Sequence, residues 1–280
     1  MRSGIHSSIQ DGGRTGMAFY GIPRAGFMDA QSAAIANVLV GNKKKGACIE
    51  MINLGMEVLF LDSATIAITG ADMQAHVDGQ SCPMYETIEI LAGSRIKFSS
   101  SRSGMISYLA VRGKWMLPSV MDSLSTYTYA QMGGFEGRLL KKGDIINVAS
   151  KLDNGLSMKW ESRPNYDAIS MIEMHKGPEW AMLSNVHDGF KIQVRKSPMG
   201  NRMGVQLLAD GLQIHVPDDF RSQAVVPGMV QCTPSGELIV ILQDGQTTGG
   251  YPRIGMIKAK ELALFNQIKV GQKFIIKLKS

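Results

Sequence analysis

The sequence predicts a mainly β protein, made of two related β domains in tandem with a few short helices. Short apolar runs rich in β-branched residues recur along the chain and are bounded by turn residues. Stretches with helical spacing are rare by comparison. A pattern of apolar residues, basic residues, a glycine turn and an apolar strand occurs at residues 139–148 and 267–278, with a looser version at 90–98. This repetition favours two domains with a shared closing element, although such recurrences also arise by chance in all-β chains.

The predicted strands follow one another along the chain. They are MEVLFL at 56–61, ATIAITG at 64–70, MISYLAVRG at 105–113 and ELIVIL at 237–242. The last strand follows a turn made by Pro234, Ser235 and Gly236, so we expect a hairpin with VVPGMVQC before it. A polar segment without periodicity separates the two halves. We therefore predict one domain over residues 1–150, a linker over 151–165 and a second domain over 166–280.

Helices are predicted at three places. The clearest spans residues 30–40, where Asp29 can cap the first turn. The second spans residues 258–267 and ends before a glycine. A third, shorter helix is expected to start at Pro178, because the fixed φ of proline suits a first helical turn.

Composition argues against several classes of function. No apolar run in the 280 residues approaches the ~20 that a membrane span needs, and the first residues lack the apolar centre of a secretory signal, so we expect a cytoplasmic protein without a membrane partner. The net charge is +6, but the lysines lack the interleaved aromatics that stack on bases, which argues against nucleic acid. The three cysteines lie far apart at no metal-ligand or redox spacing, so we expect reduced thiols and no metal site.

The common cofactor and nucleophile motifs are absent. The chain has no phosphate-binding G-x-x-x-x-G-K-[ST] loop, no dinucleotide G-x-G-x-x-G after a strand, no H-E-x-x-H and no G-x-S-x-G. ATP, nicotinamide and zinc are therefore not expected to bind this chain by itself. Met158 and Lys159 only faintly resemble a biotinylated lysine hairpin and lie in the polar linker, so no covalently attached cofactor is expected.

Three polar constellations are candidates for a site. The first, QDGGRTGMAFYGIPRAGFMDA, combines Arg14, Arg24 and Asp29 with glycines that let a backbone approach an anion closely. The alternative is that Asp29 only caps a helix and that Asp11 pairs with Arg14.

The other two constellations lie in the C-terminal half. In SPMGNRMG, Asn201 and Arg202 stand between glycines after the strand KIQVR, where a plain turn is the alternative. The segment DGQTTGGYPRIG follows the strand ELIVIL, so a rigid strand end presents its polar residues, which are Asp244, Gln246, Thr247, Thr248, Gly249, Gly250 and Tyr251. A ligand-facing loop and a purely structural turn are both compatible with this composition, and glycine-rich loops on rigid scaffolds favour the first.

Six motifs together resemble those of a known family. They are QDGGRTGMAFYGIPRAGFMD, ITGADMQAHVDGQ, MGGFEGRLLKKGD, GNRMG, VVPGMVQ and QTTGGYPRIG, in this order. The chain is similar over nearly its whole length to the biotin-dependent carboxyltransferase family, also called allophanate hydrolase subunit 2. This family includes the C subunit of prokaryotic 5-oxoprolinase and the kinase-inhibitor antagonist protein. The resemblance implies a fold of two cyclophilin-like β-barrel domains.

The resemblance also implies a function. Family members act with a companion of the kinase-inhibitor or allophanate hydrolase subunit 1 type, which is the B component of 5-oxoprolinase, and with a lactam-utilisation-type A component. The 5-oxoprolinase complex hydrolyses 5-oxoproline to glutamate with ATP, which the partner subunits bind or share. One alternative is carboxyl transfer from carboxybiotin carried by another protein. Another is a non-catalytic regulator that binds the companion subunit.

The resemblance suggests roles for the three constellations. Arg24 or Arg202 would clamp the ring carboxylate. Gln246, Thr247 and the backbone N–H groups near Gly249 and Gly250 would face the carbonyl or phosphate oxygen. Proton transfer would fall to Asp29 or Tyr251. Arg14, Asn201 and Thr248 are the further expected substrate-binding residues. The chain departs from the family at Arg221, Ser222 and Gln223, where a Ser-Glu pair is common, so an acid-base role of that glutamate does not carry over.

Overall fold

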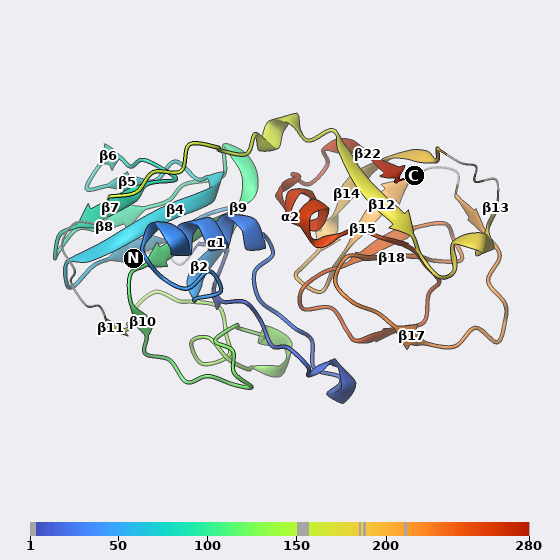
Figure 1. The fold of residues 1–280 in the computed structure, drawn as a ribbon, viewed down its shortest axis with the longest axis horizontal. Coiled ribbons are helices and arrows are strands. Elements are labelled where there is room, and N and C mark those ends of the chain that lie inside the picture. The colour runs from blue at the N-terminus through green and yellow to red at the C-terminus, as the bar shows by residue number, and fades with distance from the viewer. Residues whose placement is uncertain (1–3, 150–156, 185, 187–188, 210–211, 280) are drawn as a thin grey trace. The chain divides into compact units, whose positions relative to one another are not determined.

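The computed structural model describes residues 4–149, 157–184, 186, 189–209 and 212–279 (Figure 1). The chain divides into two compact units. The first consists of Met1–Arg14 and Ala25–Asp167, and the second of Thr15–Arg24 and Ala168–Ser280. The segment Thr15–Arg24 therefore groups with the second unit although it interrupts the sequence of the first. Part of the linker predicted at 151–165, residues 151–156, lies outside the described residues.

The first unit contains two antiparallel sheets (Figure 1). The five-stranded sheet has the order β1 (His6–Gln10), β2 (Cys48–Ile52), β9 (Ser103–Val111), β4 (Ala64–Asp72) and β7 (Thr87–Ile90). The four-stranded sheet has the order β3 (Glu57–Leu59), β8 (Arg95–Lys97), β5 (His76–Val77) and β6 (Gln80–Ser81). A short pair joins β10 (Lys114–Trp115) to β11 (Val148–Ala149). Apolar side chains of both sheets share one core, which includes Ile66, Ile96 and Leu109.

Helix α1 (Ala30–Leu39) covers strands β4 and β9 of the five-stranded sheet. Its start is fixed by Asp29, whose carboxylate accepts a hydrogen bond from the backbone N–H of Ser32. The helix buries Ala33, Ala36 and Leu39 against the sheet, and these small or straight side chains favour close helix–sheet packing. This part of the sequence also contains two 3₁₀ turns, η1 (Ala18–Tyr20) and η2 (Thr128–Ala130). The turn η1 belongs to the second unit.

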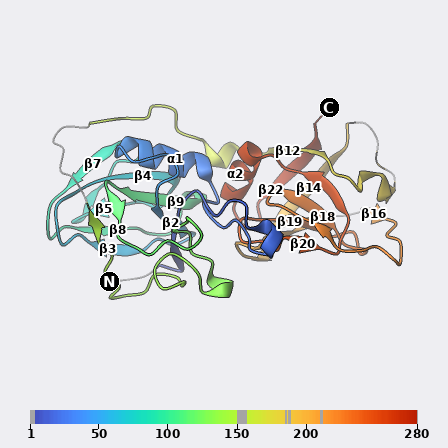
Figure 2. The ribbon, with the colours of Figure 1, turned by 60° about the horizontal axis from the view of Figure 1, so that its bottom comes forward.

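The second unit is built on a closed seven-stranded barrel (Figure 2). Its strands run in the order β12 (Met171–Lys176), β21 (Arg253–Met256), β18 (Met229–Cys232), β19 (Leu238–Ile241), β15 (Gly204–Ala209), β14 (Lys191–Gly200) and β22 (Lys273–Leu278). Strands β12 and β22 close the barrel as its one parallel pair. Inward residues alternate with outward ones along β22, where Phe274, Ile276 and Leu278 are buried, as a barrel wall requires.

Smaller elements surround the barrel. Strand β13 (Leu183–Ser184) pairs with β16 (Gln213–Ile214), and β17 (Gln223–Ala224) pairs with β20 (Thr248–Gly249). Helix α2 (Ala259–Gln267) buries Leu262 and Phe265. The 3₁₀ turns η3 (Tyr166–Ala168) and η4 (Trp180–Met182) precede and follow β12. No helix within the described residues combines the length and apolar character that crossing a bilayer demands.

The mainly β prediction is confirmed, and the four predicted strands, the hairpin and the helices at 30–40 and 258–267 are all present. Three details differ. The helix expected from Pro178 is the 3₁₀ turn η4, and β14 extends to Gly200, beyond the strand KIQVR that the sequence predicts. The segment 139–148 was expected to end in a closing strand like that of 267–278, but only its last residue belongs to a strand, β11, which pairs with β10. The three cysteines are buried and free, in line with the prediction of reduced thiols.

Candidate functional site

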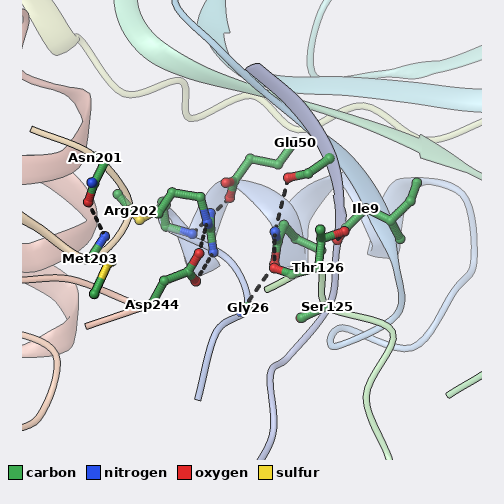
Figure 3. A network of polar contacts seen from close by, with 12 residues as sticks. Ile9, Gly26, Glu50, Ser125, Thr126, Asn201, Arg202, Met203 and Asp244 are labelled. Carbon is green, nitrogen blue, oxygen red and sulfur yellow. Dashed lines mark hydrogen bonds and ion pairs between the residues drawn. The ribbon is translucent and has the colours of Figure 1, made fainter. Parts of the chain in front are cut away.

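Two of the constellations from the C-terminal half meet in a buried ion pair (Figure 3). Arg202 follows β14 and Asp244 follows β19. The guanidinium Nε and one terminal nitrogen of Arg202 donate to the two carboxylate oxygens of Asp244, each over 3.0 Å. The backbone N–H of Asp244 also donates to the carbonyl of Arg202 over 2.8 Å. Both side chains are only 5% exposed, so this bidentate pair is a fixed element of the second unit.

Local turn chemistry places both partners. Asn201 accepts a hydrogen bond from the backbone N–H of Met203 at 2.7 Å, which closes a tight turn after β14 (Figure 3). On the other side, the N–H of Gly245 donates to the carbonyl of Leu242. A side chain at residue 245 would begin 2.5 Å from Ile241 Cγ2, so glycine is required there. The composition of both loops is thus explained in part by the geometry that brings Arg202 to Asp244.

The pairing changes how Arg202 can act. Within the second unit, the guanidinium of Arg202 binds the carboxylate of Asp244. A bidentate partner keeps the guanidinium plane in one orientation, which makes it a preorganised positive group. The clamp role expected for Arg202 stays a prediction, and so does the substrate contact expected for Asn201, whose side chain shapes the turn.

The segment from Gln246 to Tyr251 has a fixed backbone and outward side chains. Strand β20 pairs with β17, and the carbonyl of Thr247 accepts from the N–H of Val225 at 2.9 Å. The amide of Gln231 donates to the carbonyl of Tyr251 at 2.8 Å. The side chains of Gln246 and Thr248 are exposed, and Tyr251 is 42% exposed. This arrangement presents polar groups from a rigid support, as a binding loop requires.

The two glycines of this segment differ in their surroundings. A Cβ at Gly249 would lie 2.6 Å from the amide nitrogen of Gln231, so the backbone approaches that side chain closely. At Gly250 the nearest atom to a Cβ would be Ser222 Oγ at 3.7 Å, which is ordinary contact. Packing therefore explains Gly249, whereas the space at Gly250 is open to a ligand or to solvent.

An ion pair that the sequence did not indicate supports the same loop. Arg253 of β21 binds the carboxylate of Glu179 in bidentate fashion, at 2.7 and 2.9 Å, and its remaining nitrogen donates to the carbonyl of Ala224 in β17. Hydrogen bonding to Arg253 lowers the pKa of Glu179, and the same bond raises the pKa of Arg253. Strand β17, the partner of β20, is thereby tied to η4.

In the first unit, Asp29 lies in a buried polar network at the start of α1. Its carboxylate accepts from the N–H and the hydroxyl of Ser32, at 3.0 and 2.7 Å, and from the hydroxyl of Tyr166 at 3.4 Å. Tyr166 in turn lies 3.3 Å from the hydroxyl of Tyr85. Burial raises the pKa of both tyrosines. The capping role is confirmed, and the proton-transfer role of Asp29 stays a prediction.

Glu50 is a buried carboxylate that sequence reasoning missed. It is fully buried in β2 and accepts from the hydroxyl of Tyr108 at 2.7 Å and from the N–H of Met28 at 2.9 Å. The hydroxyl of Tyr108 also accepts from the N–H of Asp29 at 2.7 Å. Burial, and then the charge of Glu50, raise the pKa of Tyr108 well above its usual range. The only signal in the sequence is a glutamate inside the apolar run CIEMI.

The remaining residues of the first constellation are divided between the units. Asp11 accepts from the hydroxyls of Ser123 and Ser125 and the N–H of Leu124, each at 2.6 Å. Arg14 is buried and donates to the carbonyl of Ser125 at 2.7 Å. Both side chains fasten the segment around Ser125 to the end of β1, and Thr126 adds a bond to the carbonyl of Ile9 (Figure 3). Arg24 is exposed and groups with the second unit.

Comparison with known proteins places the chain in a family. The family model described as carboxyltransferase domain, subdomain A and B, matches residues 20–277. The chain belongs to the carboxyltransferase domain family. The resemblance seen in the six sequence motifs is thereby confirmed.

Two curated relatives of this carboxyltransferase-family chain are 5-oxoprolinase C subunits. The protein of Escherichia coli is 35% identical over 97% of this chain and 88% of its own length. The protein of Haemophilus influenzae is 30% identical over 95% of this chain and 85% of its own length. The urea amidolyase of Saccharomyces cerevisiae is 29% identical over 96% of this chain, which corresponds to 16% of that longer protein.

Solved structures of related proteins share the fold. The crystal structure of TTHA0988 matches all of this chain with a TM-score of 0.85 and 26% identity, and the matched part is 55% of that chain. The urea carboxylase of Kluyveromyces lactis matches 99% of this chain with a TM-score of 0.83 and 25% identity, over 26% of its own length. This carboxyltransferase-family chain thus spans about half of the first solved chain and about a quarter of the second.

The described residues of this carboxyltransferase-family chain contain no group of three or more histidine, cysteine, aspartate or glutamate side chains placed to hold a metal ion. The candidate site residues of the second unit are those of the preorganised Arg202–Asp244 pair, the exposed Arg24 and the supported segment 246–251. Fixed polar groups of this kind are suited to hydrogen bonding and to binding an anion.

Proposed function

We propose that this chain is the C-type subunit of a cytoplasmic, ATP-dependent 5-oxoprolinase complex, which hydrolyses 5-oxoproline to glutamate. The observation that carries the proposal is the similarity to the Escherichia coli C subunit, which extends over 97% of this chain and 88% of the relative. A match of this extent leaves little of the relative unaccounted for. The complex, with companions of the B type and the A type, is the active form.

Opening a five-membered lactam requires the loss of amide resonance, so the carbonyl must be activated. Phosphorylation of the carbonyl oxygen by ATP would supply this activation. The chain would then hold the ring carboxylate and stabilise charge on the carbonyl or phosphate oxygen. We assign the carboxylate first to Arg24, because its side chain is exposed whereas that of Arg202 is buried.

The segment 246–251 would contact the reacting end of the substrate. Gln246 and Thr248 present exposed polar side chains, and Tyr251 presents a hydroxyl that can donate or accept a proton. Thr247 and the backbone around Gly250 would complete the contacts to oxygen. Asp29 and Arg14 would act indirectly, by holding the start of α1 and the segment around Ser125.

We assign the ATP triphosphate to the companion subunits. A triphosphate needs several cationic groups or backbone N–H groups directed at it. In the second unit, the guanidinium groups of Arg202 and Arg253 each bind a carboxylate in bidentate fashion, so they do not fit that task.

The test is glutamate release from 5-oxoproline with ATP, measured with the A-type and B-type companions in the presence and absence of this chain. Turnover that requires this chain supports the proposal, and a stable complex without turnover refutes it. Arg24→Ala is expected to raise KM more than it lowers kcat, whereas Tyr251→Phe is expected to lower kcat. Arg195→Ala on the outer wall of the barrel and Tyr129→Phe, both at exposed positions, are the matched controls.

A second candidate is carboxyl transfer to a urea-like amide. It is favoured by the description of the matching family model and by the relationship to yeast urea amidolyase at 29% identity. This reaction requires carboxybiotin on another protein, since this sequence contains no convincing biotinylation motif. Streptavidin blotting of the assembled complex distinguishes the two candidates, because a biotinylated companion is expected only for carboxyl transfer.

A further inference from the structure

The first unit contains a cavity of about 790 Å³ that reaches its apolar core. Two segments line it, residues 56–64, which include β3, and residues 140–149, which end in β11. Ile49 of β2 and Leu109 and Val111 of β9 also line it, and these three belong to the core that both sheets share. The cavity is therefore an opening between strands through which the core can be reached.

Strand β3 contributes an unpaired edge to this cavity. It is the last strand of its sheet, so only β8 pairs with it. Met56 and Phe60 form backbone hydrogen bonds toward β8, to Phe98 and Ser94. Glu57 and Leu59 occupy the alternate positions of the strand. In an antiparallel ladder the alternate residues direct their N–H and C=O groups to the opposite edge. Glu57 and Leu59 line the cavity, and their backbone groups have no strand partner there among the described residues.

The segment that ends in β11 contributes a second unpaired edge. It pairs with β10 through the bond from the N–H of Met116 to the carbonyl of Asn147, and the same register pairs Trp115 with Val148. By the same alternation, Ile146 and Val148 direct their backbone groups away from β10. Both residues line the cavity. The described residues include no strand on this side of β11.

The second unit shows what lies beside the recurring sequence pattern in a closed barrel. The sequence pattern of 139–148 recurs at 267–278, where it forms β22. Strand β22 pairs with β14 on one side and with β12 on the other, and β12 completes the barrel by pairing with β21. The buried side chains of β12 are Ile172 and Met174, which alternate with more exposed residues. An extended segment with alternating apolar side chains is thus the kind of structure that lies beside this pattern.

The rim of the cavity is apolar and carries a pair of adjacent lysines. Leu61, Met116 and Ile145 line it and are 63%, 57% and 65% exposed. Exposed large hydrophobic side chains gathered around an apolar opening mark interaction sites. Lys141 and Lys142 add two positive charges. Over the whole lining the formal charges balance, because Arg112, Lys141 and Lys142 oppose Glu57, Asp62 and Asp144.

We propose that this cavity binds an extended segment of a companion subunit, which adds a strand along the free edges of β3 and β11. The bound segment carries alternating apolar side chains that enter the cavity and acidic residues that lie near Lys141 and Lys142. By analogy with β12 and β22, it runs parallel to β11. The inference rests on the proposed function only because it requires a companion subunit. Binding of the companion's segment in the cavity does not require the complex to turn over substrate.

The first test is backbone hydrogen exchange of the full chain, alone and in the assembled complex with the B-type companion. The amides of Glu57, Leu59, Ile146 and Val148 are expected to exchange at least about tenfold more slowly in the complex, because strand addition protects them. A complex that leaves these four amides unprotected overturns the proposal. Failure to form any complex overturns it as well. A complex that protects them but lacks turnover sinks the proposed function alone.

The second test compares Leu59→Pro with Leu59→Ala. The N–H of Leu59 faces the free edge, so proline removes no bond to β8 but prevents pairing with an added strand. Affinity for the companion is expected to fall at least about tenfold in Leu59→Pro and less than about threefold in Leu59→Ala. Equal affinities of the two variants contradict the proposal. Exchange at these amides that slows as the concentration of the isolated chain rises also contradicts the proposal. In that case a second copy of this chain occupies the cavity.

Discussion

The two units of this chain seal their apolar interiors in different ways. In the second unit each of the seven barrel strands pairs on both sides, so the backbone ladder closes around the core. In the first unit the strands form separate sheets, and a cavity of about 790 Å³ reaches the core between β3 and β11. A closed ladder leaves no free edge, whereas an open one leaves edges that a partner can use.

Buried polar side chains compensate for the open ladder of the first unit. Asp11 fastens the segment around Ser125, and Glu50 and Tyr108 hold the residues before α1. The second unit also holds charges in arginine–carboxylate pairs, which connect loops that flank the barrel strands. Side-chain hydrogen bonds in the first unit therefore hold segments together, a role that the backbone ladder has in the second.

The largest expected effect comes from breaking the buried pair of the second unit. Asp244→Ala leaves the guanidinium of Arg202 without its bidentate partner, and removal of one member of a buried pair costs about 3–5 kcal/mol in free energy of unfolding. Urea denaturation measures this loss. Asp218→Ala removes an exposed carboxylate and is the control. A loss of less than about 1 kcal/mol would show that the pair is not a fixed element of the barrel unit.

The polar network of the first unit is tested by Tyr108→Phe. The substitution removes the hydroxyl that donates to Glu50 and accepts from the N–H of Asp29, while the ring stays in place. Because both groups are buried, we expect a loss of about 2–3 kcal/mol in free energy of unfolding. Tyr129→Phe at an 80% exposed position is the control. A neutral result for Tyr108→Phe would contradict the structural role given to side-chain bonds in the open unit.

Local signals in the sequence were sufficient for much of the fold. The helix at 30–39 was predicted because Asp29 can cap its first turn, a signal contained within a few residues. The hairpin of β18 and β19 was predicted from its Pro-Ser-Gly turn. The segment 246–251 was identified as a loop at a strand end, and the structure places it there.

Features that depend on distant residues were not predictable in the same way. Arg202 and Asp244 were each noted, but their pairing joins loops 42 positions apart. Glu50 was missed because alternation along a strand places it opposite Ile49 and Met51, on a face that is normally solvated, whereas here the residues before α1 cover that face. The strand expected at 139–148 is mostly unpaired, since pairing requires a neighbouring edge that the segment itself does not determine.

Lys196 is a titratable group of the barrel unit whose burial predicts a pH dependence. Lys196 of β14 donates to the carbonyls of Phe265 and Ile268 at the end of α2, at 2.5 and 3.0 Å, and burial lowers its pKa to about 7. The unfolded chain binds the proton more tightly, with a pKa near ~10.4. The folded state is therefore disfavoured by the buried charge below about pH 7, and this penalty is relieved as the pH rises toward 10.

Comparison of the wild type with Lys196→Met measures this contribution. Between roughly pH 7.5 and 9.5, we expect the free energy of unfolding of the wild type to rise relative to the variant by about 1 kcal/mol per pH unit. Denaturant melts at a series of pH values give this difference. Parallel pH profiles for the two proteins would show that the lysine keeps its charge in the folded barrel.

The smallest effects separate structure from binding within the segment 246–251. Gly249→Ala forces the buried amide of Gln231 away from the carbonyl of Tyr251, so the loss of about one hydrogen bond, ~1 kcal/mol in free energy of unfolding, is expected. Gly250→Ala meets only Ser222 at 3.7 Å and is expected to leave stability unchanged. If the open space at Gly250 admits substrate, the same alanine raises KM for 5-oxoproline in the assembled complex. A stable Gly250→Ala variant with unchanged KM would assign this glycine to solvent, and the contact with substrate would then fall to the side chains of Gln246, Thr248 and Tyr251 alone.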